Sequence, residues 1–277
     1  PPSVILVLYG ILTESNIGEL FLAGFIPGIL TIIFFMATIA ITTRIFPDSG
    51  PRGEKTTFKQ KIMAFKDVWG TVILFVLVIG GIYTGIFSPE EAAGIGASGA
   101  LALALLARTM TWPIFLDCLM QTVRTSAMIF TILIGAILFN NFLVLSAVPD
   151  AIGAWIGNLP FTSTVIMLII LLIYLIMGCA LDSLAMILLT IPIFFPVVVN
   201  LGFDPIWFGI IVVMVVELGL ITPPVGMNVF IIKGMAAEVP LSKIYKGVLP
   251  FVIAQILLIT LIVFFPKIAT WLPSTMG

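Results

Sequence analysis

An apolar segment, 206–232, is interrupted in its middle by Glu217-Leu218-Gly219-Leu220-Ile221-Thr222-Pro223-Pro224-Val225-Gly226-Met227-Asn228. Pro223 and Pro224 remove two backbone N–H donors, and a proline disfavours the helical conformation in the residue before it. Gly219 and Gly226 permit backbone angles that other residues avoid. The pattern predicts a helix that unwinds here, and a simple proline kink is the alternative.

Unwound backbone within an apolar segment predicts a binding site. In a membrane, such backbone is tolerated only where it is buried in protein or lines a cavity. The freed carbonyls of Gly219 and Thr222 are suitable ligands for Na⁺, and the half-helix that follows presents its N–H groups to an anion. Thr222 and Asn228 would supply polar contacts, and Ser3, after Pro1-Pro2, would be their counterpart elsewhere in the chain.

The composition is that of a membrane protein. Of 277 residues, 61% are hydrophobic and 9% are charged, against about 45–50% and about 25% in an average soluble domain. Histidine is absent, and Cys118 and Cys179 each stand alone in apolar sequence, which argues against His-based catalysis, a His/Cys metal site and a disulfide framework. A net charge of −1 offers no surface for nucleic acid. We therefore expect an all-α polytopic protein embedded in a lipid bilayer.

Apolar runs that approach the length of a bilayer crossing recur along the chain. A helix needs about 20 apolar residues to span a hydrocarbon core about 30 Å thick. The runs are 21–43, 68–88, 92–107, 126–148, 164–181, 184–199, 206–232 and 247–266. They predict the membrane-embedded helices of the fold.

Two of these runs, 164–181 and 184–199, are separated only by Leu181-Asp182-Ser183. This spacing leaves no room for an aqueous loop and predicts a re-entrant helical hairpin, with two full spans joined by a tight turn as the alternative. Asp182 lies at the turn, where its carboxylate could coordinate a cation, lie near substrate, or only cap the second helix. Acids inside a membrane are costly, by about 2.5–3.5 kcal/mol at a helix centre, so Asp182 and Glu217 are both candidates for function.

The basic residues predict which side of the membrane each loop occupies. The longest polar stretch, 44–67, is rich in lysine and arginine, so the positive-inside bias places it in the cytoplasm. Following the chain from there, every basic residue except Lys267 falls on the cytoplasmic side. Arg108 and Arg124 flank one of the cytoplasmic segments. The run 58–69 has apolar residues at helical spacing, which predicts an amphipathic helix on the inner leaflet, with a solvated connector as the alternative. These apolar residues are Ile62, Phe65 and Trp69.

An internal repeat is visible in the order of the elements. Pro1-Pro2-Ser3 and Pro223-Pro224-Val225 each open a short apolar half-helix, which is followed by a polar bend and a long apolar helix. The bend from Thr13 to Glu19 carries acids and no base, whereas the bend from Ala237 to Lys246 carries lysines, so we expect inverted copies. Inverted repeats with broken helices are typical of secondary transporters. Because the sequence opens inside the first copy without an initiator methionine, we expect a piece of a longer chain.

These motifs resemble the large membrane subunit of tripartite ATP-independent periplasmic (TRAP) transporters, the DctM-like permease family of the ion transporter superfamily. The resemblance rests on Gly178-Cys179-Ala180-Leu181-Asp182-Ser183, on Ile191-Pro192-Ile193-Phe194-Phe195-Pro196 and on 217–228, and with 1–28 it covers essentially the whole sequence. It implies inverted repeats with a re-entrant hairpin and broken helices that carry substrate by an elevator mechanism. It also implies a permease, not an enzyme, in the inner membrane of a bacterium or archaeon.

The resemblance further implies Na⁺-coupled symport of an organic acid, such as a C4-dicarboxylate or sialic acid. A soluble periplasmic binding protein would deliver the substrate, a small four-helix membrane subunit would be the other partner, and Na⁺ would be the coupling ion with no further cofactor. The residues expected at a Na⁺ site are Gly178, Asp182, Gly219, Thr222 and Val225. The residues expected near the substrate are Ser3, Asp182, Ser183, Thr222 and Asn228.

The expected domain organisation follows the same resemblance. Its parts are 1–46, the end of the first repeat; 47–67, a cytoplasmic amphipathic connector; 68–148, the scaffold helices of the second repeat; 149–236, the transport-domain hairpin and broken helix; and 237–277, the final transmembrane helix and a periplasmic C-terminus.

Other functions stay open from the residues alone. A transporter of the arsenite or citrate type would share the broken helices without depending on a binding protein. An intramembrane aspartyl protease would need a second carboxylate beside Asp182, and Glu217 is the only other deep one. Peptide cleavage that is lost in Asp182→Asn while uptake persists would favour the protease. A non-catalytic scaffold has no need of acids in apolar segments or of unwound helices.

Overall fold

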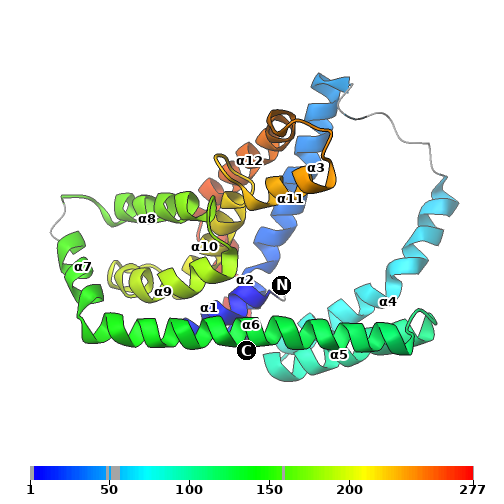
Figure 1. Cartoon of the computed structure of the whole chain (residues 1–277), viewed down its shortest axis with the longest axis horizontal. Coiled ribbons are helices and arrows are strands. Elements are labelled where there is room, and N and C mark those ends of the chain that lie inside the picture. Colours follow the sequence, from blue (N-terminus) through cyan, green and yellow to red (C-terminus); the bar gives the residue numbers. More distant parts are fainter. Residues whose placement is uncertain (1–2, 48–49, 51–56, 158–159, 277) are drawn as a thin grey trace. The chain divides into compact units, whose positions relative to one another are not determined.

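The computed structural model describes residues 3–47, 50, 57–157 and 160–276, and this part of the chain folds into helices without a strand (Figure 1). The helices are α1 Val4–Thr13, α2 Ile17–Ala23, α3 Phe25–Ile45, α4 Phe58–Tyr83, α5 Pro89–Leu106, α6 Trp112–Leu145, α7 Val148–Gly157, α8 Ser163–Gly178, α9 Ser183–Asn200, α10 Pro205–Gly219, α11 Met227–Met235, α12 Leu241–Phe264 and α13 Lys267–Thr270, before a short 3-10 turn at Pro273–Thr275. The predicted all-α class is confirmed.

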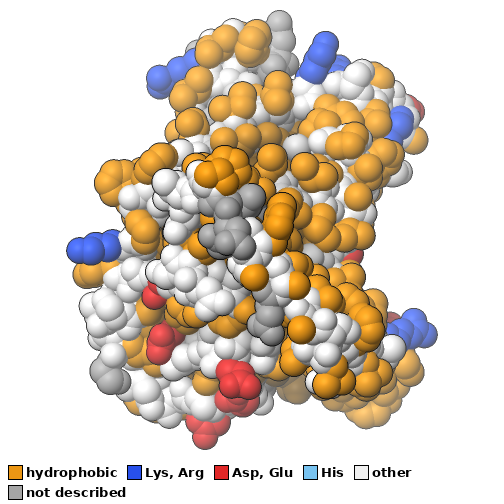
Figure 2. Space-filling view, turned by 90° about the vertical axis from the view of Figure 1, so that its left-hand side faces the viewer, with side chains coloured by type: hydrophobic (Ala, Val, Ile, Leu, Met, Phe, Trp, Pro, Cys, Tyr) orange, Lys and Arg blue, Asp and Glu red, His pale blue; other side chains and the backbone are white. Residues whose placement is uncertain are grey.

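Four helices in the described part are long and apolar enough to cross a membrane. They are Ile17–Ile45, which combines α2 and α3, Trp112–Leu145, Ser183–Asn200 and Leu241–Phe264. Large apolar side chains are exposed on most helices, and Figure 2 shows hydrophobic side chains spread over the face that it presents. A surface of this kind is suited to lipid and would associate in water. The chain is a multi-pass integral membrane protein.

The chain forms two compact units, Pro1–Ile45 with Ile129–Ser274 and Phe46–Met128 with Thr275–Gly277. Helix α10 is the core of the larger unit, where it packs against α8, α12, α2, α9 and α1. Phe208, Ile211 and Val212 are completely buried. The Trp207 indole N–H, buried with them, donates to the Ile262 carbonyl of α12 at 3.1 Å. Because α10 is apolar on all sides except at Glu217, near its end, a position inside the bundle is the one that buries its apolar faces.

Tyr9 attaches α1 to the start of α10. Its side chain is completely buried, and its hydroxyl donates to the Pro205 carbonyl at 2.6 Å. Gly209 leaves room for the ring, since a Cβ there would lie 2.7 Å from the Tyr9 Cε1. The half-helix of the predicted first copy is therefore fixed to the core through one buried hydrogen bond and one ring.

We predict that Tyr9→Phe lowers the free energy of unfolding by about 1 kcal/mol, because the half-buried Pro205 carbonyl loses its donor while the ring packing is kept. Thermal unfolding of the purified protein in detergent measures the change. Tyr83→Phe is the matched control, since the Tyr83 side chain is 37% exposed and its hydroxyl makes only a long, exposed contact of 3.3 Å with the Thr275 hydroxyl, which water can replace. An equal loss of unfolding free energy in the two variants would contradict a stabilising role for the hydrogen bond from Tyr9 to Pro205.

Helices α8 and α9 form the predicted helical hairpin, with residues 179–182 as its turn. A buried polar pair joins the two arms: the Thr190 hydroxyl lies 2.9 Å from the Tyr174 hydroxyl and 2.7 Å from the Met186 carbonyl. Tyr174 is completely buried and Thr190 nearly so. A satisfied polar pair in an apolar interior fixes how the two arms face one another.

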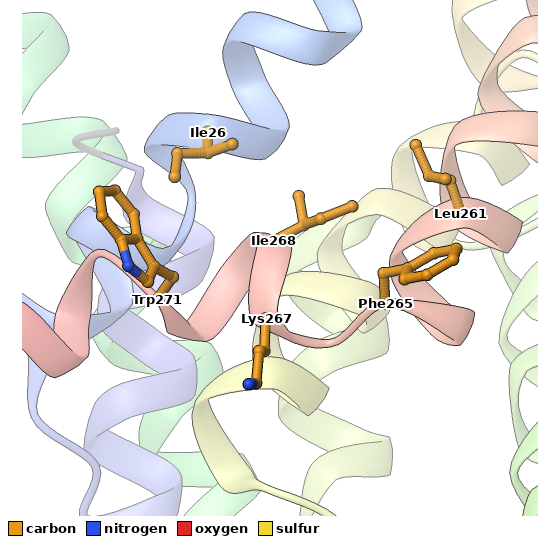
Figure 3. Close-up of a pocket in the computed structure, with 6 residues that line it drawn as sticks. All are labelled: Ile26, Leu261, Phe265, Lys267, Ile268 and Trp271. Carbon is orange, nitrogen blue, oxygen red and sulfur yellow. The ribbon is translucent and has the colours of Figure 1, made fainter.

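The order of elements in the predicted repeat is present in the structure. Helix α1, the bend after it and α2–α3 correspond to α11, the bend after it and α12. The two long helices, α3 and α12, pack together with the Phe35 and Phe251 rings 5.4 Å apart. They run antiparallel, because Ile26 at the start of α3 shares a hollow with Leu261 and Phe265 at the end of α12 (Figure 3). Antiparallel counterparts are what inverted copies require.

Helix α4 crosses the predicted boundary at 67 without a break. It begins at Phe58, where Thr57 and Gln60 form a capping box, and ends at Tyr83. The segment 58–67 is therefore helical and continuous with the apolar helix after it. The side chains of Ile62 and Phe65 lie outside the described part of the chain, so an amphipathic face there stays a prediction. In the same unit, α4 packs against α5.

Helix α6 is longer than the sequence predicts. The apolar run 126–148 places Arg124 beside a helix, but α6 extends from Trp112 to Leu145 and contains it. Asp117, Gln121 and Arg124 recur at helical spacing, so they interrupt the hydropathy of the segment without interrupting its helix. Arg124, predicted to lie at the edge of a cytoplasmic segment, is therefore part of a continuous helix, and the side of the membrane that it occupies stays a prediction. Similarly, α12 begins at Leu241, so part of the predicted bend 237–246 is helical.

Candidate functional site

The turn of the α8–α9 hairpin lies against the interrupted end of α10. Gly178, the last residue of α8, faces Gly219, the last residue of α10. A Cβ on Gly219 would lie 2.6 Å from the Gly178 carbonyl carbon and 2.7 Å from its Cα. The two backbones are therefore in direct contact, which small residues permit at helix crossings in membranes. We call this contact, with the residues 178–183 and 217–228 around it, the junction.

A backbone hydrogen bond closes the junction on its other side. The Gly226 N–H donates to the Cys179 carbonyl at 3.1 Å, and the Cys179 thiol lies 3.6 Å from the Pro223 carbonyl. Cys179 is buried. The hairpin turn and the interrupted helix are thus held together by main-chain atoms. Reasoning from the sequence missed Cys179 as part of the site, because nothing local distinguishes it from other small apolar residues.

The helix is unwound between α10 and α11, as predicted. Residues 220–226 lie outside both helices, the Pro223–Pro224 peptide bond is cis, and Gly226 has a φ of 59°. Gly226 is required there, because left-handed backbone angles are strained in residues with a Cβ. The alternative of a simple proline kink is wrong.

Hydrogen bonds across the gap keep the unwound segment compact. The Thr222 hydroxyl donates to the Leu218 carbonyl at 2.6 Å. The Asn228 N–H donates to the Leu220 carbonyl at 3.0 Å, and the Thr222 N–H donates to the Gly219 carbonyl at 3.1 Å. Thr222 and Asn228 are both half-buried. The segment is a defined turn whose carbonyls point in several directions.

The structure places Asp182 at the N-terminus of α9. Its carboxylate accepts a hydrogen bond from the Leu184 N–H at 3.0 Å, so the predicted capping role is present. The side chain is exposed, whereas Ser183, the first residue of the helix, is buried. An exposed carboxylate at the edge of the junction has further lone pairs with which to contact a cation.

Glu217 is the other acid of the junction. It is the exposed residue on a stretch of α10 that is otherwise almost wholly buried from Trp207 to Leu220. Glu217 lies two residues before Gly219, and Asp182 lies four residues after Gly178, so both acids belong to segments that meet at the Gly178–Gly219 contact. A cation bound at this contact would be attracted by both negative charges. The junction therefore combines backbone carbonyls with negative charge.

Val225 and Ser3 complete the predicted set. The Val225 carbonyl accepts a hydrogen bond from the Tyr245 hydroxyl at 2.6 Å, and the Val225 side chain is 40% exposed. Ser3 is the N-cap residue of α1, in extended conformation and without a side-chain capping bond. Helix α1 packs on α9 and α10. The structure therefore brings Gly178, Gly219 and the unwound segment together directly, and Ser3 lies at the start of a helix that packs on two of the same elements.

The donor set of the junction suits a hard cation. The atoms available are main-chain carbonyls, the Thr222 hydroxyl and two carboxylates, which are the oxygen ligands that alkali and alkaline-earth ions prefer. Among the described residues, no group of three or more His, Cys, Asp or Glu side chains could hold a metal ion. A cation here would depend on backbone carbonyls, which is how unwound helices bind Na⁺.

The family described as "Tripartite ATP-independent periplasmic transporter, DctM component" matches residues 1–268. The chain belongs to this family. DctM members are permeases and not enzymes, so the aspartyl protease alternative is removed. The resemblance seen in the hairpin turn and the broken helix is confirmed by a match that covers nearly the whole chain.

Curated relatives in the DctM family carry several substrate names. The chain is 33% identical to the C4-dicarboxylate TRAP transporter large permease protein DctM of Pseudomonas aeruginosa, over 100% of this chain and 64% of that protein. It is 31% identical to the sialic acid TRAP transporter large permease protein SiaM of Vibrio cholerae, over 99% of this chain and 64% of that protein. It is 32% identical to the isethionate TRAP transporter permease protein DctMQ of Oleidesulfovibrio alaskensis, over 97% of this chain and 42% of that protein. The chain thus spans less than two thirds of the length of these relatives.

Proposed function

We propose that this DctM-family chain forms the ion and substrate site of a TRAP permease that imports an organic anion together with Na⁺ across the inner membrane. A periplasmic binding protein delivers the anion, and a small membrane subunit completes the permease. The observation that carries the proposal is the junction, where the backbone of the hairpin turn directly contacts the backbone of an unwound helix. Unwound backbone inside a membrane is tolerated where it is buried in protein or lines a cavity, and an ion or substrate site provides such a setting.

The roles of the residues follow from their chemistry. Carbonyls of 219–225 and the Asp182 carboxylate coordinate Na⁺, with Gly178 and Gly219 allowing the close approach. The positive end of the α11 helix dipole faces the acidic group of the substrate, together with the side-chain amide of Asn228 and with Thr222. Ser183, and Ser3 from the other repeat, contribute further hydroxyls. Na⁺ draws the hairpin turn and the unwound segment into the geometry that the anion needs. This shared geometry couples the binding of Na⁺ to the binding of the anion.

The hairpin and the broken helix move together in this proposal. Helix α8 has 16 residues, which at 1.5 Å per residue extend for about 24 Å, less than a hydrocarbon core of about 30 Å. The shortness of this arm supports a re-entrant hairpin in our proposal, with its turn within the membrane at the junction. An elevator-like displacement of 149–236 carries the junction from one side of the membrane to the other, because its main-chain hydrogen bonds keep the two parts in one body.

The substrate class is an organic acid anion. The relatives are named for a C4-dicarboxylate, sialic acid and isethionate, all of which are anions. No Lys or Arg occurs in 178–183 or 217–228, so the positive groups of the junction are helix N–H donors and the coupling ion. Such a site favours a carboxylate or sulfonate and leaves the remainder of the substrate to be selected elsewhere.

The complete permease in liposomes tests the proposal. We predict that labelled-substrate uptake requires both an inward Na⁺ gradient and the cognate binding protein, and falls to the level of empty liposomes when K⁺ replaces Na⁺. Full uptake without Na⁺ would contradict the coupling. Full uptake without the binding protein would contradict the tripartite mechanism and favour a transporter of the arsenite or citrate type.

A further inference from the structure

The unwound segment receives a hydrogen bond from a helix outside the junction. The Tyr245 hydroxyl lies 2.6 Å from the Val225 carbonyl and 3.0 Å from the Pro224 carbonyl. Tyr245 belongs to the first turns of α12, about 20 residues further along the chain. A hydroxyl has one proton to donate, so it is shared between the two carbonyls or alternates between them.

This hydrogen bond acts on the part of the junction that has the fewest other restraints. Pro223 and Pro224 have no N–H, so the backbone after Thr222 cannot continue the hydrogen bonds that Leu220, Ile221 and Thr222 make to the end of α10. The Gly226 N–H fixes one end of the segment to Cys179, and the Thr222 hydroxyl fixes the other end to Leu218. Between these ends, the carbonyls of Pro224 and Val225 are oriented by Tyr245.

We propose that Tyr245 is a positioning residue for the cation site of the junction. Its hydroxyl orients the Pro224–Val225 backbone so that the second lone pair of the Val225 carbonyl, and the carbonyls before it, are held where a cation can use them. This inference rests on the proposed Na⁺-coupled function. It assigns to α12, outside the broken helix and hairpin, a part in setting the affinity for the ion.

The ordering of the segment explains why one hydroxyl matters. Backbone that is free to move must be ordered when a cation binds, and that entropy cost weakens binding. A hydrogen bond from a neighbouring helix orders the segment in advance. Tyr245→Phe keeps the half-buried ring and removes only the bond. The result should be a weaker affinity for Na⁺ with little change in the maximal rate.

The test compares Tyr245→Phe with wild type in the complete permease, reconstituted with its binding protein. We expect the Na⁺ concentration for half-maximal uptake to rise about three- to tenfold, which is the effect of one modest hydrogen bond. We expect uptake at saturating Na⁺ to stay within about twofold of wild type. Tyr83→Phe is the control, because Tyr83 is an exposed tyrosine at the end of α4 and should leave both quantities unchanged.

Hydrogen–deuterium exchange of 220–232 gives a second readout that does not depend on transport. In Tyr245→Phe, the amides of this peptide should exchange faster than in wild type without Na⁺, and saturating Na⁺ should narrow the difference. If Tyr245→Phe changed neither the Na⁺ concentration for half-maximal uptake nor the amide exchange of 220–232, the positioning role of Tyr245 would be overturned. Uptake by the wild type that is independent of Na⁺ would instead overturn the proposed function, so the two failures are distinct.

Discussion

Gly219→Ala is expected to abolish uptake and to destabilise the permease by about 2–3 kcal/mol, the range of overpacked interiors. A Cβ at this position would lie 2.6 Å and 2.7 Å from backbone atoms of Gly178, and 3.1 Å from the Cys179 nitrogen. Backbone cannot rotate away as a side chain can, so the hairpin turn must separate from α10. That separation would also break the hydrogen bond from Gly226 to Cys179.

Two further alanine variants make the prediction quantitative. Gly178→Ala places a Cβ 3.3 Å from the Gly219 Cα and from the Val216 carbonyl oxygen, so a smaller loss is expected. Gly234→Ala, in α11, has no atom within 4 Å of the added Cβ, and it should be neutral or stabilising by up to about 1 kcal/mol. Thermal unfolding in detergent and uptake in liposomes should both show the largest loss in Gly219→Ala, a smaller loss in Gly178→Ala and no loss in Gly234→Ala. Wild-type uptake in Gly219→Ala would show that the close contact is not needed for transport.

Asp182→Asn is expected to eliminate Na⁺-driven uptake while leaving stability nearly unchanged. Asparagine caps a helix about as well as aspartate, so the hydrogen bond from the Leu184 N–H can persist and the free energy of unfolding should change by less than about 0.5 kcal/mol. The charge next to the junction is lost, and a neutral amide is a weaker ligand for a cation. Initial uptake rates at a fixed Na⁺ gradient, with thermal unfolding of the same sample, separate the loss of a cation ligand from a loss of stability.

Asp204→Asn is the matched control for the loss of charge. Asp204 also caps a helix, accepting from the Trp207 N–H at 2.8 Å at the start of α10, and its side chain is also exposed. It belongs to the opposite end of that helix from Gly219. Its variant should transport like wild type. If Asp182→Asn transported as well as Asp204→Asn, the carboxylate of Asp182 would be only a helix cap.

The sequence predicted those features that depend on local chemistry. Pro223, Pro224 and the flanking glycines indicated an unwound helix because prolines lack a donor wherever they occur. Leu181-Asp182-Ser183 indicated a hairpin turn because it leaves no room for an aqueous loop between two apolar runs. Both features are present. The hydropathy that indicated a membrane protein was equally local, and it misplaced the ends of helices that continue through polar residues, as in α4, α6 and α12.

What the sequence determined by itself was therefore the class of the protein, its family and the positions of its two interrupted elements. The tertiary structure decided how those elements meet: that Gly178 faces Gly219, that Cys179 accepts from Gly226, and that Tyr245 reaches the Val225 carbonyl. The physical reason is that helix unwinding and chain reversal depend on a few adjacent residues. Contacts between distant segments depend instead on how whole helices pack, which no short stretch of sequence records.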